Sequence, residues 1–443
     1  MSFVNAQPIF SLITYGCQMN ESDSESVAGE LAARGWRRAE HEEQADVVLV
    51  NGCVVRRSAE KRALGRLWQL APLKRRRPDL IIGVLGCLAQ KDGRAFLEEF
   101  PHVDLVVGTH DLPKIGALLD EVRQTRERLV CVDDIDKPTS FTAEPLRQNP
   151  LKAWVAIMYG CDNNCSYCIV PRLRGRERSR PAEEIVAEVR RLAQGGWREL
   201  TLLGQNVNSY HDGRHDFADL LRLVAGVEGI ERVRYVTSHP KDLSDRLIET
   251  VATTRKICEN FHLPAQAGSN HVLQRMNRGY SREDYLRLVE RIRRAIPQAV
   301  VTTDLMVGFP GETEQDFADT LDLARSVRWD SAFTFIYSPR EETPAAHWPD
   351  DVPLAVKKER LRRLNEIQET ISAEVNEAAV GSRQEVLVEG PSRRSDQMLM
   401  GRTRGDKVVI FAGPADLVGQ TIELNITRAA AHTLFGERVN SNG

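Results

Sequence analysis

Short apolar runs alternate with helix-like segments along the first third of the chain. The runs are rich in aliphatic and β-branched residues, and the segments between them carry apolar residues at helical spacing. This alternation is typical of a parallel sheet with helices on both faces. We therefore expect an open α/β domain over residues 1–132. Its predicted strands are 10–14, 46–50, 80–85 and 104–107, and its predicted helices are 22–34, 58–70 and 91–100.

The alternation stops and then returns. Residues 133–150 are rich in Asp, Pro, Thr and Glu and have little periodicity, which predicts a linker. About six strand-helix units follow over residues 151–378, as in a partial or full β/α barrel whose reactive loops lie at the C-terminal strand ends. Its predicted strands after the opening run 153–158 are 199–203, 232–236, 261–263, 300–307 and 331–337, and its predicted helices are 181–194, 217–225, 282–295 and 314–327.

The last part of the chain changes pattern again. A charged helix predicted near 355–379 has an apolar stripe with which it can pack back on the barrel. Short alternating segments broken by Gly, Pro and Ser then predict a small all-β barrel over residues 379–443. Such modules often bind nucleic acid, but the charges here are balanced, so composition alone leaves RNA binding open. Its predicted strands are 385–389, 407–411 and 420–426.

Composition narrows the class of protein. The 443 residues are 42% hydrophobic and 28% charged, close to globular averages. No apolar run of about 18 residues occurs, and the N-terminus lacks the pattern of a secretory signal, so we expect a protein of the reducing cytoplasm that does not enter a membrane. The formal charge of -3 argues against indiscriminate nucleic-acid binding, although a local basic stripe can still contact phosphates.

Three cysteines lie within eight residues after the apolar run 153–158. They are Cys161, Cys165 and Cys168, in a C-x3-C-x2-C loop that can turn three thiolates toward one point. Three thiolates suit a cubane iron-sulfur cluster that keeps one iron free of protein sulfur. A structural zinc site would need a fourth ligand, and buried core thiols would not cluster in this way.

Three more cysteines each follow a glycine at the end of a predicted strand. They are Cys17, Cys53 and Cys87. Glycine permits a tight bend or the close approach of a bulky ligand, and parallel strands end at one sheet edge, so these thiolates are expected to form a second three-cysteine cluster site. The alternative is three separate buried thiols. Cys131 and Cys258 stand alone and are predicted to pack in the core.

Arginines alternate with other residues directly after the first cysteine loop. The stretch 171–181 contains five arginines. Arginine forks match phosphate geometry, so this stripe favours an anionic substrate over a merely solvated face. The candidate substrate-binding residues are Arg174, Arg176, Arg178 and Arg180.

Uncharged amides follow a predicted barrel strand in Gly204, Gln205 and Asn206, where they can fix a polar cofactor by hydrogen bonds. Gln266 lies in a similar segment, 264–269, after another strand. Ordinary turn chemistry is the alternative for both segments. Their place at strand ends makes them candidate cofactor-binding residues.

The cysteine loop resembles the cluster signature of radical S-adenosylmethionine enzymes, and further stretches are similar to motifs of the tRNA methylthiotransferase family. The resemblance spans nearly the whole chain, and its C-terminal segment resembles a TRAM-type RNA-binding barrel. The stretches that carry it are 15–20, 168–171, 174–177, 203–210 and 276–280.

The resemblance implies two [4Fe-4S] clusters and S-adenosylmethionine as cofactors. One cluster, on Cys161, Cys165 and Cys168, would bind S-adenosylmethionine at its free iron and cleave it reductively to a 5'-deoxyadenosyl radical, with Tyr167 against the bound cofactor. The catalytic cluster on Cys17, Cys53 and Cys87 would carry or relay sulfur. The implied reaction places a methylthio group on C2 of N6-isopentenyl adenosine beside the tRNA anticodon. A monomer with an electron donor of unknown identity is expected.

Two other functions compete with this interpretation. A related enzyme methylthiolates an aspartate of a ribosomal protein, and a non-catalytic RNA-binding protein could use the clusters as staples. The amide and arginine segments favour RNA as substrate, and three-thiolate sites with open irons make poor staples. The chain departs from the family pattern at Asn164, Arg172, Ala267 and the pair Glu341 and Glu342, which bear on substrate detail.

Overall fold

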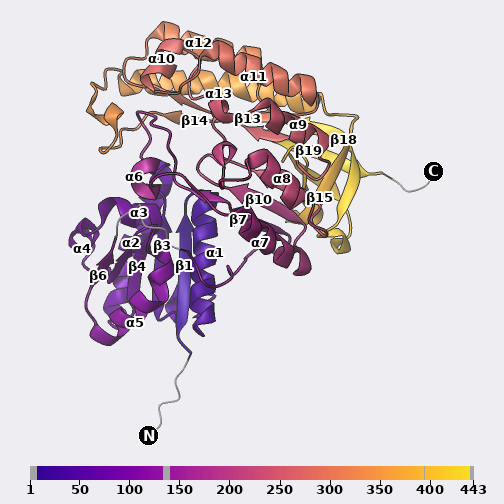
Figure 1. Ribbon diagram of the computed structural model, residues 1–443. Helices are drawn as coiled ribbons and strands as arrows, with labels where there is room; N and C mark the ends of the chain where they lie inside the picture. Colours follow the sequence, from indigo (N-terminus) through magenta and orange to yellow (C-terminus); the bar gives the residue numbers. More distant parts are fainter. Residues whose placement is uncertain (1–6, 133–139, 394, 440–443) are drawn as a thin grey trace.

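The computed structural model describes residues 7–132, 140–393 and 395–439. The first seven residues of the predicted linker 133–150 lie outside this part of the chain, as do the two ends of the sequence. An N-terminal domain (indigo and purple) and a C-terminal barrel (yellow) lie on different sides of a central domain (Figure 1). The limits of the three domains stay a prediction.

The N-terminal domain is an open parallel sheet in the order β2-β1-β3-β4-β5-β6. The predicted 91–100 helix is wrong as a single element, because Gly93 turns the chain at a φ of 49° between α3 and α4. The strands are β1 (Ile9–Tyr15), β2 (Arg37–Arg38), β3 (Val47–Gly52), β4 (Ile81–Leu85), β5 (Leu105–Val107) and β6 (Leu129–Cys131), and the helices are α1 (Gln18–Ala33), η1 (Glu42–Gln44), α2 (Arg57–Arg76), α3 (Gly86–Asp92), α4 (Ala95–Glu99), η2 (Leu112–Lys114) and α5 (Ile115–Thr125).

The central domain is a partial β/α barrel. Two parallel sheets, β11-β10-β7 and β12-β13-β14, are joined by a bridge between Val233 and Ile257. The strands are β7 (Lys152–Ala156), β8 (Met158–Tyr159), β9 (Arg178–Ser179), β10 (Glu199–Leu203), β11 (Arg232–Tyr235), β12 (Asn260–His262), β13 (Val300–Val307) and β14 (Ser331–Ile336). The helices are α6 (Val170–Arg174), α7 (Ala182–Gln194), η3 (Val207–Ser209), α8 (Phe217–Ala225), η4 (Pro240–Asp242), α9 (Asp245–Thr253), α10 (Asn270–Arg275), α11 (Arg282–Ala295), α12 (Glu314–Val327), η5 (Pro344–His347) and α13 (Leu354–Glu377).

The C-terminal module is a closed barrel in the order β15-β16-β17-β19-β18. Sequence patterning anticipates three of its strands and misses β16 and β19. Its core is small and apolar, with Val386, Val409 and Leu424 fully buried. The elements are β15 (Arg383–Ser392), β16 (Ser395–Thr403), β17 (Val408–Ala412), η6 (Ala415–Leu417), β18 (Thr421–Ala430) and β19 (Thr433–Arg438).

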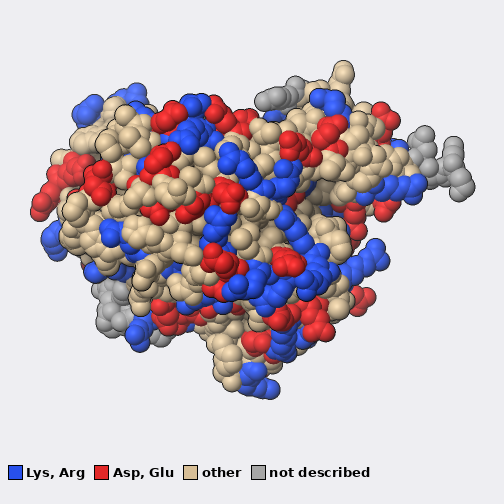
Figure 2. All heavy atoms as spheres, turned by 90° about the horizontal axis from the view of Figure 1, so that it is seen from above, with Lys and Arg blue, Asp and Glu red and all other residues tan. Residues whose placement is uncertain are grey.

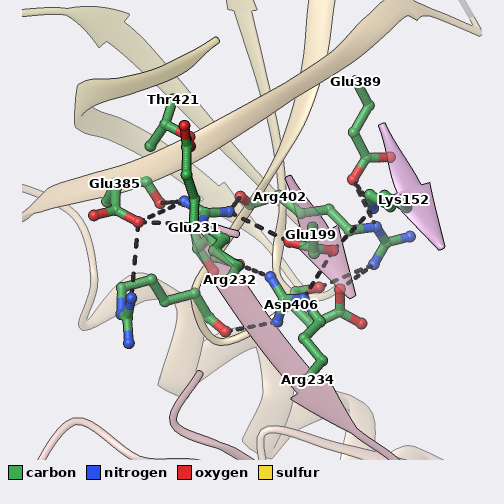
Figure 3. A network of polar contacts seen from close by, with 12 residues as sticks. Lys152, Glu199, Glu231, Arg232, Arg234, Glu385, Glu389, Arg402, Asp406 and Thr421 are labelled. Atoms are coloured by element: carbon green, nitrogen blue, oxygen red, sulfur yellow. Dashed lines mark hydrogen bonds and ion pairs between the residues drawn. The ribbon is translucent and has the colours of Figure 1, made fainter. Parts of the chain in front are cut away.

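The C-terminal barrel docks where the central strands begin. Lys152, Glu199 and Arg232 are the first residues of the neighbouring strands β7, β10 and β11 and stand in register. Arg232 donates hydrogen bonds to the backbone oxygen of Arg402 at 2.9 Å and to the carboxylate of Glu385 at 2.8 Å (Figure 3). The C-terminal barrel therefore lies at the end of these strands opposite to the cysteine loop.

The hairpin between β16 and β17 enters this end of the partial barrel. Arg234 donates to the backbone oxygens of Thr403 and Arg404, both at 2.7 Å. At the start of β12, Asn260 donates to the backbone oxygen of Gly405 at 2.8 Å. A Cβ on Gly405 would stand 2.3 Å from a side-chain atom at the start of β13, so glycine allows the close approach of the hairpin.

Charges of both signs are mixed over the surface. Figure 2, which looks down on the top of Figure 1, shows basic and acidic side chains interspersed on that face. On α13, for instance, Arg362 pairs with Glu359 and Glu366. Because the charges are mixed, phosphate recognition on this face must depend on local sites and not on one broad basic surface.

No helix of the described residues combines the length and apolar character needed to cross a membrane.

Candidate active site

Three cysteines stand at the carboxyl ends of three adjacent strands. Cys17 follows β1, Cys53 follows β3, and Cys87 lies in the first turn of α3 after β4. Cys53 and Cys87 are buried and Cys17 is half-buried. A hydrogen bond between Cys53 and Cys17 lowers the pKa of Cys17 to about 6 and raises that of Cys53. We call this set the N-terminal triad.

Two buried asparagines support the N-terminal triad. Asn20 donates to Asn51 Oδ1 at 3.0 Å, and Asn51 donates back to the Asn20 backbone oxygen at 2.9 Å. Cys17 Sγ lies 3.3 Å from Asn20 Oδ1. The glycines before the cysteines make room for this pair: a Cβ on Gly16 would lie 2.7 Å from Asn20 Oδ1, and one on Gly86 2.2 Å from Asn51 Oδ1. The strand-Gly-Cys pattern thus has a local steric reason.

The second set, which we call the loop triad, follows β7 and β8. Cys165 is buried, whereas Cys161 and Cys168 are half-buried. Burial raises the pKa of Cys168 to about 12, and neighbouring Cys165 adds to this effect. The buried Arg278 donates to Cys165 Sγ at 3.3 Å and to the Pro264 backbone oxygen at 2.9 Å. The guanidinium therefore fixes the loop triad against the segment that follows β12.

One arginine connects the two triads. Arg174 ends α6, the short helix that begins two residues after Cys168. It is buried, and it donates to the Asp23 carboxylate at 2.6 Å. Burial raises the pKa of Cys87, and the positive charge of Arg174 opposes this rise. The same charge adds to the hydrogen bond from Cys53 in lowering the pKa of Cys17. The chain leaving the loop triad thus contacts the N-terminal triad through Arg174.

The donor chemistry of both triads fits an iron-sulfur cluster. Among the described residues, no three His, Cys, Asp or Glu side chains converge on a single metal-ion position. A cubane binds each thiolate to a different iron, so its ligands stand farther apart than those of one ion. Each triad also has one buried arginine, Arg174 or Arg278, whose charge opposes that of the thiolates.

The predicted arginine stripe does not form one exposed surface. Arg174 is directed to Asp23, so it does not lie on a solvated face. Arg178 contacts His110 Nδ1 at 3.2 Å, and Arg180 pairs with Glu188 at 2.9 Å. Arg176 is exposed. Sequence reasoning located these residues beside the cysteine loop, but it could not separate a buried connecting arginine from an exposed one.

The predicted amides lie around the same loop. The Gln205 side chain accepts from the backbone nitrogen of Gly160, the residue before Cys161. Asn206 is buried and donates to Asp242 at 2.7 Å. A Cβ on Gly204 would stand 2.5 Å from a side-chain atom of Met158, so this strand end packs closely. These amides therefore order the strand ends, and their contact with a cofactor stays a prediction.

Tyr167, which lies between Cys165 and Cys168, belongs to a group of packed aromatic rings. Its ring meets the Phe309 ring edge-on at 6.2 Å, and Phe309 meets Tyr337 at 5.1 Å. Arg278 lies 3.4 Å from the Tyr167 hydroxyl. Gln266 is buried with a φ of 68°, and its backbone pairs with β13 next to Asp304. These residues border the inner side of the partial barrel.

Sequence reasoning missed three supporting residues. Asn20 and Arg278 lie inside stretches that carry the family resemblance, and Asn51 directly precedes Gly52 and Cys53. For Asn20 and Asn51 the available signal was a polar residue close to a candidate cysteine ligand in the sequence; for Arg278 it was the family resemblance alone. Its buried partners come from elements far apart in the sequence, so the hydrogen bonds themselves could not be predicted.

Comparison with protein families divides the chain into the same three parts. Residues 155–324 match the radical SAM superfamily, residues 10–108 match the uncharacterized protein family UPF0004, and residues 377–439 match the TRAM domain. The radical S-adenosylmethionine methyltransferase TsrM from Kitasatospora setae aligns with a TM-score of 0.55 at 14% identity over 77% of this chain and 74% of that one, a likeness of fold alone.

Relatives of known name match almost end to end. A tRNA-2-methylthio-N(6)-dimethylallyladenosine synthase from Syntrophomonas wolfei is 50% identical over 97% of this chain and 98% of its own length. One from Desulforamulus reducens is 48% identical over 98% of this chain and 96% of its own. With such identity over nearly its whole length, the chain belongs to the family of tRNA-2-methylthio-N(6)-dimethylallyladenosine synthases within the radical SAM superfamily.

Proposed function

We propose that the chain attaches a methylthio group to C2 of N6-isopentenyl adenosine next to the anticodon of tRNA. The observation that carries this proposal is the connection between the two triads through Arg174, from the loop triad to Asp23 and Cys87. A reaction that needs both reductive cleavage of S-adenosylmethionine and delivery of sulfur requires two such sites near each other. Full-length identity to enzymes of this name supports the same reaction.

The loop triad holds the [4Fe-4S] cluster that radical SAM enzymes use, and the N-terminal triad holds a second one. A bound cluster at the loop triad supplies the electron that cleaves S-adenosylmethionine. The chain contributes position and charge. Arg278 holds Cys165 at 3.3 Å, while Gln205 holds the backbone before Cys161. These contacts keep the loop in one geometry before the cofactor arrives, so little ordering remains to be done on binding.

The residues around the inner side of the barrel bind S-adenosylmethionine in this proposal. Tyr167 packs on one side, and Gln266 and Asn206 supply polar groups at the ends of β12 and β10. Two molecules of S-adenosylmethionine are used, one for the methyl group and one for radical formation. The buried aromatic rings beside the loop triad exclude water from the reactive centre.

The C-terminal barrel holds the tRNA, and Arg176 is a candidate stripe residue that is exposed for phosphate contact, as is the neighbouring Arg172. We further propose that the protein works as a monomer in the cytoplasm and takes electrons from a separate donor. The two clusters of cysteines suited to metal ligation support a reducing compartment.

The experiment is anaerobic reconstitution with iron and sulfide, followed by incubation with S-adenosylmethionine, reductant and tRNA that carries isopentenyl adenosine. Mass spectrometry of the digested tRNA should show the methylthio nucleoside, and 5'-deoxyadenosine should form alongside it. If a ribosomal-protein aspartate gains the methylthio group while the tRNA stays unmodified, the proposed substrate is wrong.

A matched pair of cysteine variants tests the cluster assignment. Cys165→Ala should lose about half of the bound iron and all 5'-deoxyadenosine formation, because it removes one ligand of the loop triad only. Cys131→Ala removes a thiol on β6 that belongs to neither triad, so it should keep the full iron content and the formation of 5'-deoxyadenosine. Full cofactor cleavage by Cys165→Ala would contradict the assignment of the loop triad.

A further inference from the structure

The inner face of β12, β13 and β14 is only partly covered by side chains. Along β13, buried residues alternate strictly with half-buried ones. The buried ones, such as Val301 and Leu305, pack against the outer helices. The half-buried ones, among them Asp304 and Met306, point to the barrel interior. A fully packed β/α barrel would bury this face too, so open space borders it here.

Two phenylalanines lie at the edge of this face, Phe333 exposed and Phe335 half-buried. Phe333 and Phe335 pair with Asp304 and Met306 across β13 and β14, so they point to the same interior side. Phe333 is 48% exposed. The ring of His262 meets the Phe333 ring edge-on at 6.1 Å. Large exposed aromatic side chains inside a cavity are unfavourable unless something covers them.

The N-terminal domain contributes an arginine to the same place. The guanidinium carbon of Arg56 lies 5.2 Å from the Phe333 ring centre and 5.6 Å from that of Phe335. Arg56 is itself exposed, and the preceding Val55 is 55% exposed. Both follow Cys53 by two or three residues. The aromatic edge of the central barrel therefore lies beside the loop that leaves the N-terminal triad.

A basic cavity adjoins this group. A space of about 600 Å³ lies between α2 and the loop after β14, and its lining includes Arg57, Lys61, Arg340 and His347. The acidic Glu60 in its wall pairs with Arg340 at 2.7 Å and with Lys91 at 3.0 Å, so its charge is compensated. Glu341 also lines the cavity, so its net positive charge is small, and Arg57 and Lys61 remain to contact the phosphates on either side of a single nucleotide.

We propose that Val55, Arg56, Phe333 and Phe335 form a binding platform for the unstacked purine of the substrate RNA and its apolar N6 substituent, a proposal that rests on the proposed function. Single-stranded bases are bound by stacking on aromatic rings and on arginine planes. Val55 supplies an apolar neighbour for the isopentenyl group. Asp304 is half-buried on the same face, and its buried Oδ1, which has no hydrogen-bond partner among the described residues, can accept from the base once the side chain rotates toward the interior.

The test measures binding and turnover with two short RNA hairpins that differ only in the presence of the isopentenyl group on one loop adenosine. The unmodified protein should prefer the isopentenylated hairpin in fluorescence anisotropy. Phe333→Ala should weaken that binding roughly 10- to 100-fold and remove the preference, whereas Phe333→Tyr, which keeps the ring, should retain it. Leu223→Ala removes a similarly exposed side chain (42%) on α8 and serves as the control.

A second variant covers the case in which Phe333→Ala fails to fold. Arg56→Lys keeps the charge but loses the planar group. It should weaken the binding of the isopentenylated hairpin several-fold, with little change in the binding of S-adenosylmethionine. Unchanged RNA binding in both variants would overturn the platform, as would a loss confined to S-adenosylmethionine binding. If no RNA is methylthiolated but the hairpin preference exists and depends on Phe333, the proposed reaction fails and the platform stands.

Discussion

Glu199 lies at the centre of the charge cluster on which the C-terminal barrel docks. Its side chain is 2% exposed and faces three cations: Arg234 Nε at 3.0 Å, Lys152 Nζ at 3.6 Å and Arg232 Nη1 at 3.8 Å. Figure 3 shows them between β7, β10, β11 and the docked barrel. The contact of Arg234 Nε with Glu199 Oε1 is an ion pair and not an aligned hydrogen bond, since Arg234 Nε has no hydrogen-bond partner among the described residues.

Glu199→Gln should therefore weaken the docked state strongly. It keeps the shape of the side chain but leaves Arg232 and Arg234 buried with less negative charge, and breaking a buried charge cluster costs about 3 kcal/mol or more. The matched change Glu231→Gln removes a carboxylate that is 39% exposed and pairs with the exposed Arg198, and its side-chain oxygen can still accept from Thr421 Oγ1 of the barrel, so it costs at most about 1 kcal/mol.

Hydrogen exchange detected by mass spectrometry separates the two variants without assuming two-state unfolding of a multidomain chain. In Glu199→Gln, exchange of the β15 and β18 amides should become roughly a hundredfold faster, the equivalent of about 3 kcal/mol. In Glu231→Gln it should change less than about tenfold. Equal small effects in the two variants would refute the view that Glu199 holds the barrel in place.

The same residue gives the docking a defined dependence on pH. Burial raises the pKa of Glu199, but Arg234 and Lys152 outweigh it, so the pKa lies below its ordinary value of 4.5. The undocked state thus binds a proton more readily, and the stabilisation is complete above pH 4.5 and is lost as the pH falls through the lowered pKa. Subtracting the exchange profile of Glu199→Gln from that of the unmodified protein should isolate this dependence; a difference that is constant with pH in this range would contradict it.

Three further changes test the site. Gly204→Ala should displace Met158 and so weaken the binding of S-adenosylmethionine roughly tenfold. Calorimetry measures this affinity, and an unchanged value would show that the strand end can relax. Asn51→Ala leaves buried Asn20 groups without a partner and should cost about 2 kcal/mol in thermal unfolding with loss of N-terminal iron, whereas normal iron content would count against the asparagine support. Glu341→Gln removes an acid from the basic cavity and should tighten RNA binding about twofold at low salt only; the same gain at high salt would exclude an electrostatic cause.

The class of fold and the positions of the cysteines could be predicted because each depends on local pattern. Alternating apolar segments indicate the N-terminal sheet and the partial barrel, and the glycine before Cys17 or Cys87 marks a strand end. The C-terminal barrel was harder to predict. Register shifts interrupt β15 between Val388 and Gly390 and β18 between Ile426 and Arg428, so alternation is broken in the strands that pair with β16 and β19.

Long-range polar partners could not be predicted from local pattern. Arg174 reads in the sequence as one of five similar arginines, and only the packing of α6 against the N-terminal domain makes it the buried partner of Asp23. Likewise Arg232 contacts Glu385, which lies 153 residues later in the chain. A charged residue at the start of a strand does not indicate which domain will supply the opposite charge.

The two ends of the central strands serve different purposes in this molecule. Charged first residues such as Lys152, Glu199 and Arg232 hold the C-terminal barrel, while cysteine, glycine and amide residues after the last positions form the candidate reactive site. Function in β/α barrels concentrates at the second end because the loops there can vary without disturbing the strands. The C-terminal barrel is therefore fixed at a distance from the triads, and a substrate that touches both must extend along the inner edge of β14, where Phe333 and Arg56 are exposed.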